Sequence, residues 1–176
     1  MLEGWVDSDY AADPDSSWSV TGYVMSMNGG PVSWRAKRQG CVTLSSSEAE
    51  FVAASQCGVE VVYLRALLKG LGLEQDGATR VWEDNASCIM MSENPVNRER
   101  SRHIDTRLYF IRDLVSDGVM KLVKVPGTEN VADALTKSVP PSLEKHRRYL
   151  WGSGVPFSAF WTKVEGWEGV AVFKLE

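Results

Sequence analysis

Three aspartates stand at points of the chain where a predicted strand gives way to a turn or a helix. Asp7 ends a short predicted strand at 3–7, Asp84 follows a predicted strand at 79–82, and Asp133 lies in a predicted helix after a strand at 119–125. Acids placed in this way converge at one end of a sheet, where clefts form. The residue types and their positions therefore predict a cluster of carboxylates at a sheet edge.

A fourth acid, Glu50, is singled out by helical periodicity. Apolar residues recur at helical spacing along a stripe, and counting back from its first member reaches position 50; the stripe consists of Ala54, Cys57, Val61, Leu64, Leu68 and Leu71. A glutamate on the buried stripe of a helix is costly unless it is paired or binds a metal. Glu48 lies about 200° round the helix from Glu50 and forms a capping box with Ser45. Glu48 is therefore structural and Glu50 a site candidate.

Four carboxylates with no histidine partner favour hard cations, Mg²⁺ or Mn²⁺, over zinc. Two such ions about 4 Å apart stabilise the attacking and leaving oxygens of a phosphodiester. Each aspartate also has a plainer interpretation. Asp7 fits a solvated turn, Asp84 fits an N-cap of the short helix that follows it, and Asp133 fits a solvent-facing helix position.

The elements that must position these acids follow from turn signals and periodicity. Strands are expected at 3–7, 19–27, 31–37, 79–82 and 119–125, with Asn28-Gly29-Gly30 as a hairpin turn. Residues 42–44 extend that hairpin or lead into the next helix. Helices are expected over about seven turns from the capping box, and at 86–91, 104–115, 130–136 and 142–150. Three successive strands followed by a helix predict an antiparallel meander that opens an α+β or mixed α/β domain.

Length and composition fit one soluble domain. The chain has 176 residues, 44% hydrophobic and 24% charged, and its three cysteines form no metal-type pair. No apolar run is expected to cross a membrane and the N-terminus has no signal-peptide shape, so an intracellular protein with reduced cysteines is expected. The net charge of −4 argues against a nucleic-acid partner, but segments 34–38 and 98–107 are locally basic and four metal-binding carboxylates would account for the whole excess.

Seven motifs in order resemble the ribonuclease H domains of copia-type retrotransposon polyproteins. They are W-V-D-S-D-Y-A, T-G-Y-V, G-P-V-S-W-R-A-K-R-Q, L-S-S-S-E-A-E-F-V-A, E-D-N-A-S, R-H-I-D and N-V-A-D-A-L-T-K. The resemblance implies an α/β ribonuclease H-like fold, a five-stranded mixed sheet with three antiparallel and then two parallel strands, flanked by helices. It also implies a metal site made by Asp7, Glu50, Asp84 and Asp133.

The function implied by this resemblance is endonucleolytic hydrolysis of the RNA strand of RNA·DNA hybrids with two Mg²⁺ ions, for which Mn²⁺ substitutes. The expected partners are the hybrid and, in a parent polyprotein, the reverse transcriptase polymerase domain. The expected location is the cytoplasm, within a virus-like particle, or the nucleus. The alternatives are a catalytically inactive hybrid-binding module and a ribonuclease H-like nuclease that acts on DNA. The ribonuclease H domain is expected at 1–150, and residues 151–176 form an extension that matches nothing in the family.

Substrate contacts are expected from Arg35, Lys37 and Arg38, which lie along a predicted strand; a solvated edge strand is the alternative. Asn85 and Arg102 are further substrate-binding candidates. His103 is expected to contact the scissile region or a phosphate, or else to be satisfied locally at a helix start. Two positions depart from the family. The loop P-G-T-E-N before Asp133 has no histidine, and Trp18 stands where relatives often carry arginine.

Overall fold

Five strands form the sheet of this domain. The computed structural model describes residues 1–13, 15–93 and 102–137; the extension at 151–176 and the helix expected at 142–150 lie outside them. The strands are β1 (Leu2–Asp9), β2 (Val20–Met27), β3 (Gly30–Arg38), β4 (Thr79–Glu83) and β5 (Met120–Lys124). Strand β1 is longer than the 3–7 expected, so Asp7 lies inside it and does not end it.

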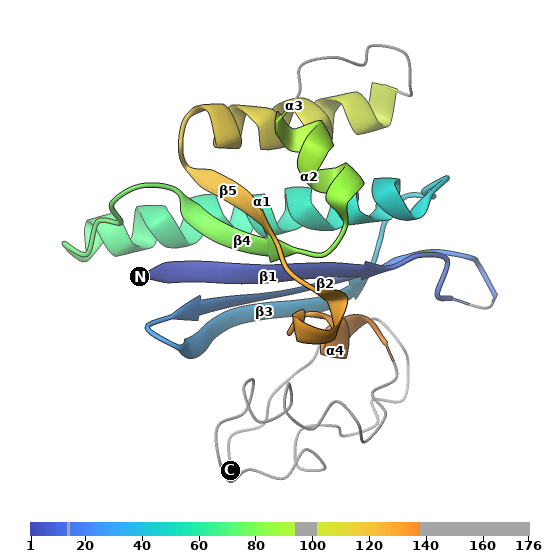
Figure 1. Ribbon diagram of the computed structural model, residues 1–176, viewed down its shortest axis with the longest axis horizontal. Helices are drawn as coiled ribbons and strands as arrows, with labels where there is room; N and C mark the ends of the chain where they lie inside the picture. The colour runs from blue at the N-terminus through green and yellow to red at the C-terminus, as the bar shows by residue number, and fades with distance from the viewer. Residues whose placement is uncertain (14, 94–101, 138–176) are drawn as a thin grey trace, which may run out of the picture.

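The strand order is β3-β2-β1-β4-β5. Strands β1, β2 and β3 pair antiparallel, and β4 pairs parallel with both β1 and β5. This is the five-stranded mixed sheet expected from the resemblance, and the predicted fold class is confirmed. Because β1 and β4 are parallel neighbours, their carboxyl ends lie at the same edge of the sheet (Figure 1).

The hairpin turn between β2 and β3 is made by Asn28 and Gly29, whose φ angles are +52° and +84°. Positive φ at both central residues defines a type I′ turn, which matches the twist of the flanking strands. Residues 42–44 do not extend the hairpin; they lead into the first helix.

Helix α1 (Ser46–Gly70) is the long helix predicted from the capping box. The Ser45 hydroxyl accepts the Glu48 backbone N–H at 3.2 Å, as expected. The Glu48 carboxylate accepts the N–H of Leu44 at 2.6 Å, one residue earlier than the Ser45 amide that was expected. Gly72, at φ +74°, follows the end of the helix, where a left-handed residue satisfies the last carbonyls.

One side of α1 is buried against the sheet. The predicted stripe lies in the main core from Ala54 to Leu68, where it packs with Leu2, Val6 and Met25 of the strands. Leu71 was expected in this stripe and is exposed instead, because the helix ends at Gly70 and Leu71 turns away with its cap.

The opposite face of α1 is exposed and yet largely apolar. Its outward positions carry Val59, Val62, Tyr63, Ala66 and Leu67. Val59 and Tyr63 are each 60% exposed. With apolar residues on both faces, α1 is long and apolar enough to cross a membrane by length and composition alone, although no apolar run of that kind was expected. Half of its most apolar window is buried inside the domain.

The remaining helices divide between the two faces of the sheet. Helices α2 (Ala86–Glu93) and α3 (Arg102–Ser116) lie on the side of α1 (Figure 1). After β5 come a 3₁₀ turn, η1 (Gly127–Glu129), and a single helical turn, α4 (Asp133–Thr136). Helix α4 packs on the opposite face of the sheet, where Val131 and Ala134 meet Val24. It is shorter than the helix expected at 130–136.

Candidate metal centre

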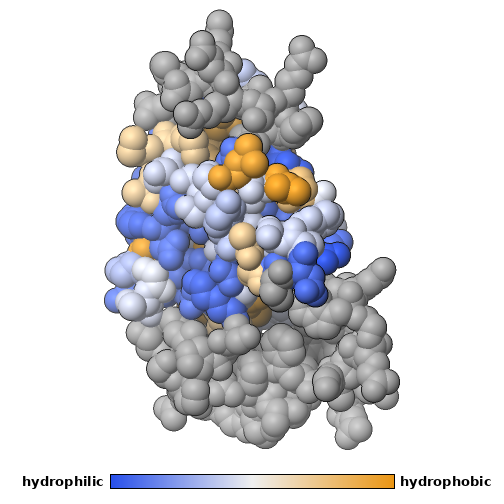
Figure 2. Space-filling model, turned by 90° about the vertical axis from the view of Figure 1, so that its right-hand side faces the viewer, coloured by the Kyte–Doolittle hydropathy of each residue, from blue (hydrophilic) through white to orange (hydrophobic). Residues whose placement is uncertain are grey.

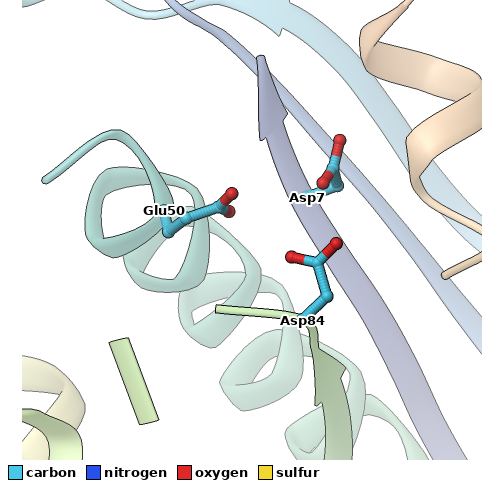
Figure 3. Close-up of side chains that lie close together, drawn as sticks. All are labelled: Asp7, Glu50 and Asp84. Carbon is cyan, nitrogen blue, oxygen red and sulfur yellow. The ribbon is translucent and has the colours of Figure 1, made fainter. Parts of the chain in front are cut away.

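Three of the predicted acids converge at one edge of the sheet. Asp7 comes from β1, Glu50 from the first turns of α1, and Asp84 from the residue after β4. One carboxylate oxygen from each lies within 4.8 Å of the others. Figure 3 shows the three carboxylates directed toward one another. Parallel pairing of β1 with β4 and the packing of α1 on β1 create this convergence.

The electrostatics of this cluster are unfavourable without a cation. Burial raises the pKa of Asp7 from 3.8 to about 7, and the nearby charges of Asp84 and Asp133 add to the rise. Burial also raises the pKa of Glu50 strongly, and the charges of Glu83 and Asp7 contribute. Within the described part of the chain, Oε2 of Glu50 is buried and has no hydrogen-bond partner.

These properties fit a hard divalent cation. A bound cation would neutralise the carboxylates that repel one another, and the unpartnered oxygen of Glu50 could coordinate it. The donors in the cluster are all carboxylate oxygens, which Mg²⁺ and Mn²⁺ prefer.

Asp133, the fourth predicted ligand, lies beside the cluster rather than within it. Its carboxylate forms an ion pair with Lys137, the residue that follows the end of α4. It is near enough to Asp7 to raise the pKa of that carboxyl. Its role as a metal ligand stays a prediction.

The alternative role of Asp84 as a helix cap is not what the structure shows. The side chain that caps α2 belongs to Asn85, whose Oδ1 accepts the N–H of Cys88 at 3.1 Å. The Asp84 carboxylate is therefore left to face Asp7 and Glu50. The backbone of η1 approaches it closely, since a Cβ at Gly127 would lie 2.9 Å from Asp84 Oδ2.

A further acid at the site, Glu83, was missed in the sequence. It is fully buried near Glu50, whose pKa its charge raises, and burial raises its own pKa. Its Oε1 accepts the Asn85 N–H at 2.9 Å, while Oε2 has no partner among the residues that the structure describes. The signal was strand alternation, because Thr79, Val81 and Glu83 share the face of β4 that meets α1.

The predicted substrate-binding cations have different surroundings. Arg38 pairs with Asp13 at 2.9 Å and stacks over the Trp18 ring at 4.9 Å. Lys37 is exposed on β3, and Arg35 is half-buried on the same strand. Arg102 and His103 are the first residues of α3 and not part of a preceding loop, and their side chains lie outside the described part of the structure.

The surface at this end of the molecule is polar. Figure 2 looks onto the end at which β1 points in Figure 1, and the described surface there is mostly hydrophilic with a few apolar residues. A polar surface beside buried carboxylates is compatible with a solvated, charged ligand.

The chain is similar to known proteins in sequence and in structure. No family model matches the chain. It is 43% identical over 140 residues to the retrovirus-related Pol polyprotein from transposon TNT 1-94 of Nicotiana tabacum, covering 80% of this chain and 10% of that protein. It is 33% identical over 136 residues to the Pol polyprotein from transposon RE2 of Arabidopsis thaliana, covering 77% of this chain and 9% of that protein. The chain thus spans about a tenth of the length of these relatives.

Solved structures share the fold. An LC11 ribonuclease H1 in complex with an RNA/DNA hybrid matches with a TM-score of 0.55 and 16% identity, covering 77% of this chain and 93% of that chain. At this identity the likeness concerns the fold.

Proposed function

The chain belongs to the ribonuclease H domains of copia-type retrotransposon Pol polyproteins, and from this premise we propose that it is a metal-dependent endonuclease. Its substrate is the RNA strand of RNA·DNA hybrids. The observation that carries the proposal is the convergence of Asp7, Glu50 and Asp84 within 4.8 Å at the edge of a ribonuclease H-type sheet.

The metal ligands would be the three clustered carboxylates, with Asp133 completing the set from α4. Two Mg²⁺ ions, or Mn²⁺ in their place, supply Lewis-acid stabilisation of the attacking and leaving oxygens of a phosphodiester when bound. The protein contributes the placement of the ligands. Asp7 is fixed in β1 and Glu50 on the buried side of α1. Asp84 lies between β4 and Asn85, the residue that caps α2.

The hybrid would lie across the polar end of the molecule. We assign phosphate contacts to Arg35 and Lys37 on β3, with Arg38 beside them, and further substrate contacts to Asn85, Arg102 and His103. A non-specific enzyme of this kind reads helix shape and 2′-hydroxyl groups rather than base sequence. In a parent polyprotein the polymerase domain would be its working partner, and the reaction would take place in cytoplasmic particles or the nucleus.

Cleavage of three labelled duplexes tests the proposal. RNA·DNA, RNA·RNA and DNA·DNA duplexes are incubated with the chain and Mg²⁺, then with chelator. We expect cleavage of the RNA strand of the hybrid alone, abolished by chelator. Cleavage of DNA would indicate a ribonuclease H-like DNA nuclease. Binding of the hybrid without cleavage would indicate an inactive binding module, and equal cleavage in chelator would end the metal-dependent mechanism.

A further inference from the structure

A buried hydroxyl reaches the candidate metal centre from the opposite face of the sheet. The Thr136 hydroxyl, on the last residue of α4, hydrogen-bonds to Oδ2 of Asp7 across 129 positions of sequence. Both side chains are buried. The same hydroxyl lies 3.2 Å from the Asp133 carbonyl oxygen. A hydroxyl has one proton to donate, and the Asp7 carboxylate, which must be ionised to bind a metal, is then the stronger acceptor.

The position of Thr136 is fixed from outside its own helix. A single helical turn is not stable in isolation, so tertiary contacts must hold α4. At its start, Asn130 donates from Nδ2 to the Val6 carbonyl at 2.8 Å and accepts the Ala132 N–H at 3.1 Å. Val6 directly precedes Asp7. The same short segment is therefore attached to β1 at two consecutive residues, the Val6 carbonyl and the Asp7 side chain.

This hydrogen bond occupies one oxygen of Asp7 and leaves the other oxygen for a metal. Oδ2 accepts from Thr136. Figure 3 shows one oxygen of Asp7 directed toward Glu50 and Asp84 and the other pointing away from them. With one oxygen anchored, the carboxylate cannot rotate freely about its Cβ–Cγ bond. Because the carboxylate is already oriented before the metal binds, the entropic cost of metal binding is lower.

We propose that Thr136 is a positioning residue for Asp7, through which α4 sets the Mg²⁺ affinity of the Asp7, Glu50 and Asp84 cluster. The inference rests on the proposed function, since it takes the cluster to be a metal centre. It adds to that function a residue that touches neither metal nor substrate and acts through one oxygen of one ligand.

The test uses three variants of the full chain and measures metal binding apart from cleavage. Thr136→Val keeps the side-chain shape and removes the hydroxyl, and Thr136→Ser restores the hydroxyl. Thr79→Val is the matched control. Thr79 is also buried, but it lies at the start of β4, at the end of the strand away from Asp84, and its hydroxyl accepts a hydrogen bond from Arg65. Mg²⁺ affinity is measured by calorimetry and by the Mg²⁺-dependent rise of the melting temperature; hybrid cleavage is titrated with Mg²⁺ in parallel.

We expect Thr136→Val to lose about ten-fold in Mg²⁺ affinity, in the range found when groups that orient metal ligands are removed. Thr136→Ser should bind within about two-fold of the wild type, and Thr79→Val should bind as the wild type does. Cleavage by Thr136→Val should recover at high Mg²⁺. Wild-type affinity in Thr136→Val, or an equal loss in Thr136→Ser and Thr79→Val, would overturn the inference.

The same measurements separate this inference from the proposed function. Mg²⁺ binding that depends on the Thr136 hydroxyl, in a chain that cleaves no duplex, would support the positioning role and refute the nuclease. Hybrid cleavage by the wild type with unchanged Mg²⁺ affinity in Thr136→Val would do the reverse. A wild type that binds no Mg²⁺ would overturn both.

Discussion

Two glutamates one turn into α1 have opposite surroundings. Glu48 caps the helix through the Leu44 N–H, whereas Glu50 is 6% exposed and faces Asp7 and Asp84 with an unpartnered oxygen. Glu50→Gln keeps the shape and removes the charge. We predict that hybrid cleavage falls by orders of magnitude, while the melting temperature in chelator stays equal or rises as carboxylate repulsion is relieved.

Glu48→Ala is the control for that prediction. It should lose about 1 kcal/mol of stability through the weakened cap, with near-normal turnover in the folded fraction. Melting curves and cleavage rates of both variants decide between the two roles. A Glu48→Ala variant that is inactive but fully stable would show that the wrong glutamate has been assigned to the metal.

The raised pKa of Asp7 predicts how metal-free stability depends on pH. The folded chain holds a proton on Asp7 up to about pH 7, whereas the unfolded chain releases it near 3.8. Between these values the folded state binds more protons, so the contribution of Asp7 to stability is greatest at acid pH and is lost as pH rises. In chelator, the melting temperature of the wild type relative to Asp7→Asn should therefore fall as pH rises through this window.

Bound Mg²⁺ should remove most of that fall, because the cation stabilises the ionised carboxylates. Melting temperatures of both proteins, measured from about pH 4 to pH 7 with and without Mg²⁺, check the prediction. A wild-type advantage that grows with pH in chelator would mean that Asp7 is stabilised as a carboxylate by the protein alone.

For single residues, the sequence was informative where a charged residue stood at a position that periodicity predicts to be buried. Glu50 occupies the position that extends an apolar stripe back toward the helix start, and the structure places it with Asp7 and Asp84 as expected. Glu83 was missed because β4 has only five residues. Thr79 and Val81 are the only residues before it on the buried face of the strand, and two positions are too few to reveal an alternation of buried and exposed residues. The contact of Thr136 with Asp7 joins residues 129 positions apart, and no local pattern encodes it.

Among the elements, α4 depends on a glycine in a neighbouring strand. Gly22 pairs with Asp7 in the sheet, and a Cβ there would lie 2.7 Å from Thr136 Cγ2 and 3.0 Å from the Ala132 carbonyl oxygen. Gly22→Ala should therefore push α4 away from the sheet, at a cost of about 1–3 kcal/mol. We predict that Mg²⁺ affinity falls as well, because Thr136 and Asp133 move with the helix.

Gly40→Ala is the matched control, since a Cβ at Gly40 meets nothing within 4 Å. It should change neither melting temperature nor Mg²⁺ binding. If Gly22→Ala binds Mg²⁺ as the wild type does despite lower stability, the position of α4 does not matter to the centre.

Elements stabilised by local sequence signals were predicted well, and elements held by tertiary contacts were not. Helix α1 carries its own cap, a long periodic stripe and a glycine after its end, so the sequence defined it almost to the residue. Helix α4 is one turn held by Asn130 and Gly22, and local propensity overestimated its length. The expected end of β1 was wrong because Ser8 and Asp9 look like turn residues, yet they pair with Thr21 and Val20 of β2.

For the molecule as a whole, the distribution of charge decides how a polyanion can bind. Neutralising Arg35, Lys37 and Arg38 together should raise the Michaelis constant for the hybrid and flatten its salt dependence, because each phosphate contact contributes about 0.9 to the logarithmic slope. Arg38 is already paired with Asp13 and stacked on Trp18, so we expect the loss of about two contacts rather than three.

Lys69→Ala is the control for this prediction. Lys69 is exposed at the far end of α1, where it pairs with Glu74, and its removal should leave the salt slope unchanged. Steady-state rates at several salt concentrations provide the measurement. An unchanged slope in the triple variant would leave β3 as a solvated edge strand whose charges prevent strand association.

The apolar residues on the outer face of α1 also govern how the purified protein behaves in solution. Val59, Val62, Tyr63 and Leu67 form an exposed apolar patch on each molecule, and the net charge of −4 near neutral pH opposes association of two molecules through it. That repulsion vanishes near the isoelectric point of 5.3. The protein should therefore salt out most readily in sulfate near that pH, through contacts made at the end of α1 far from Glu50.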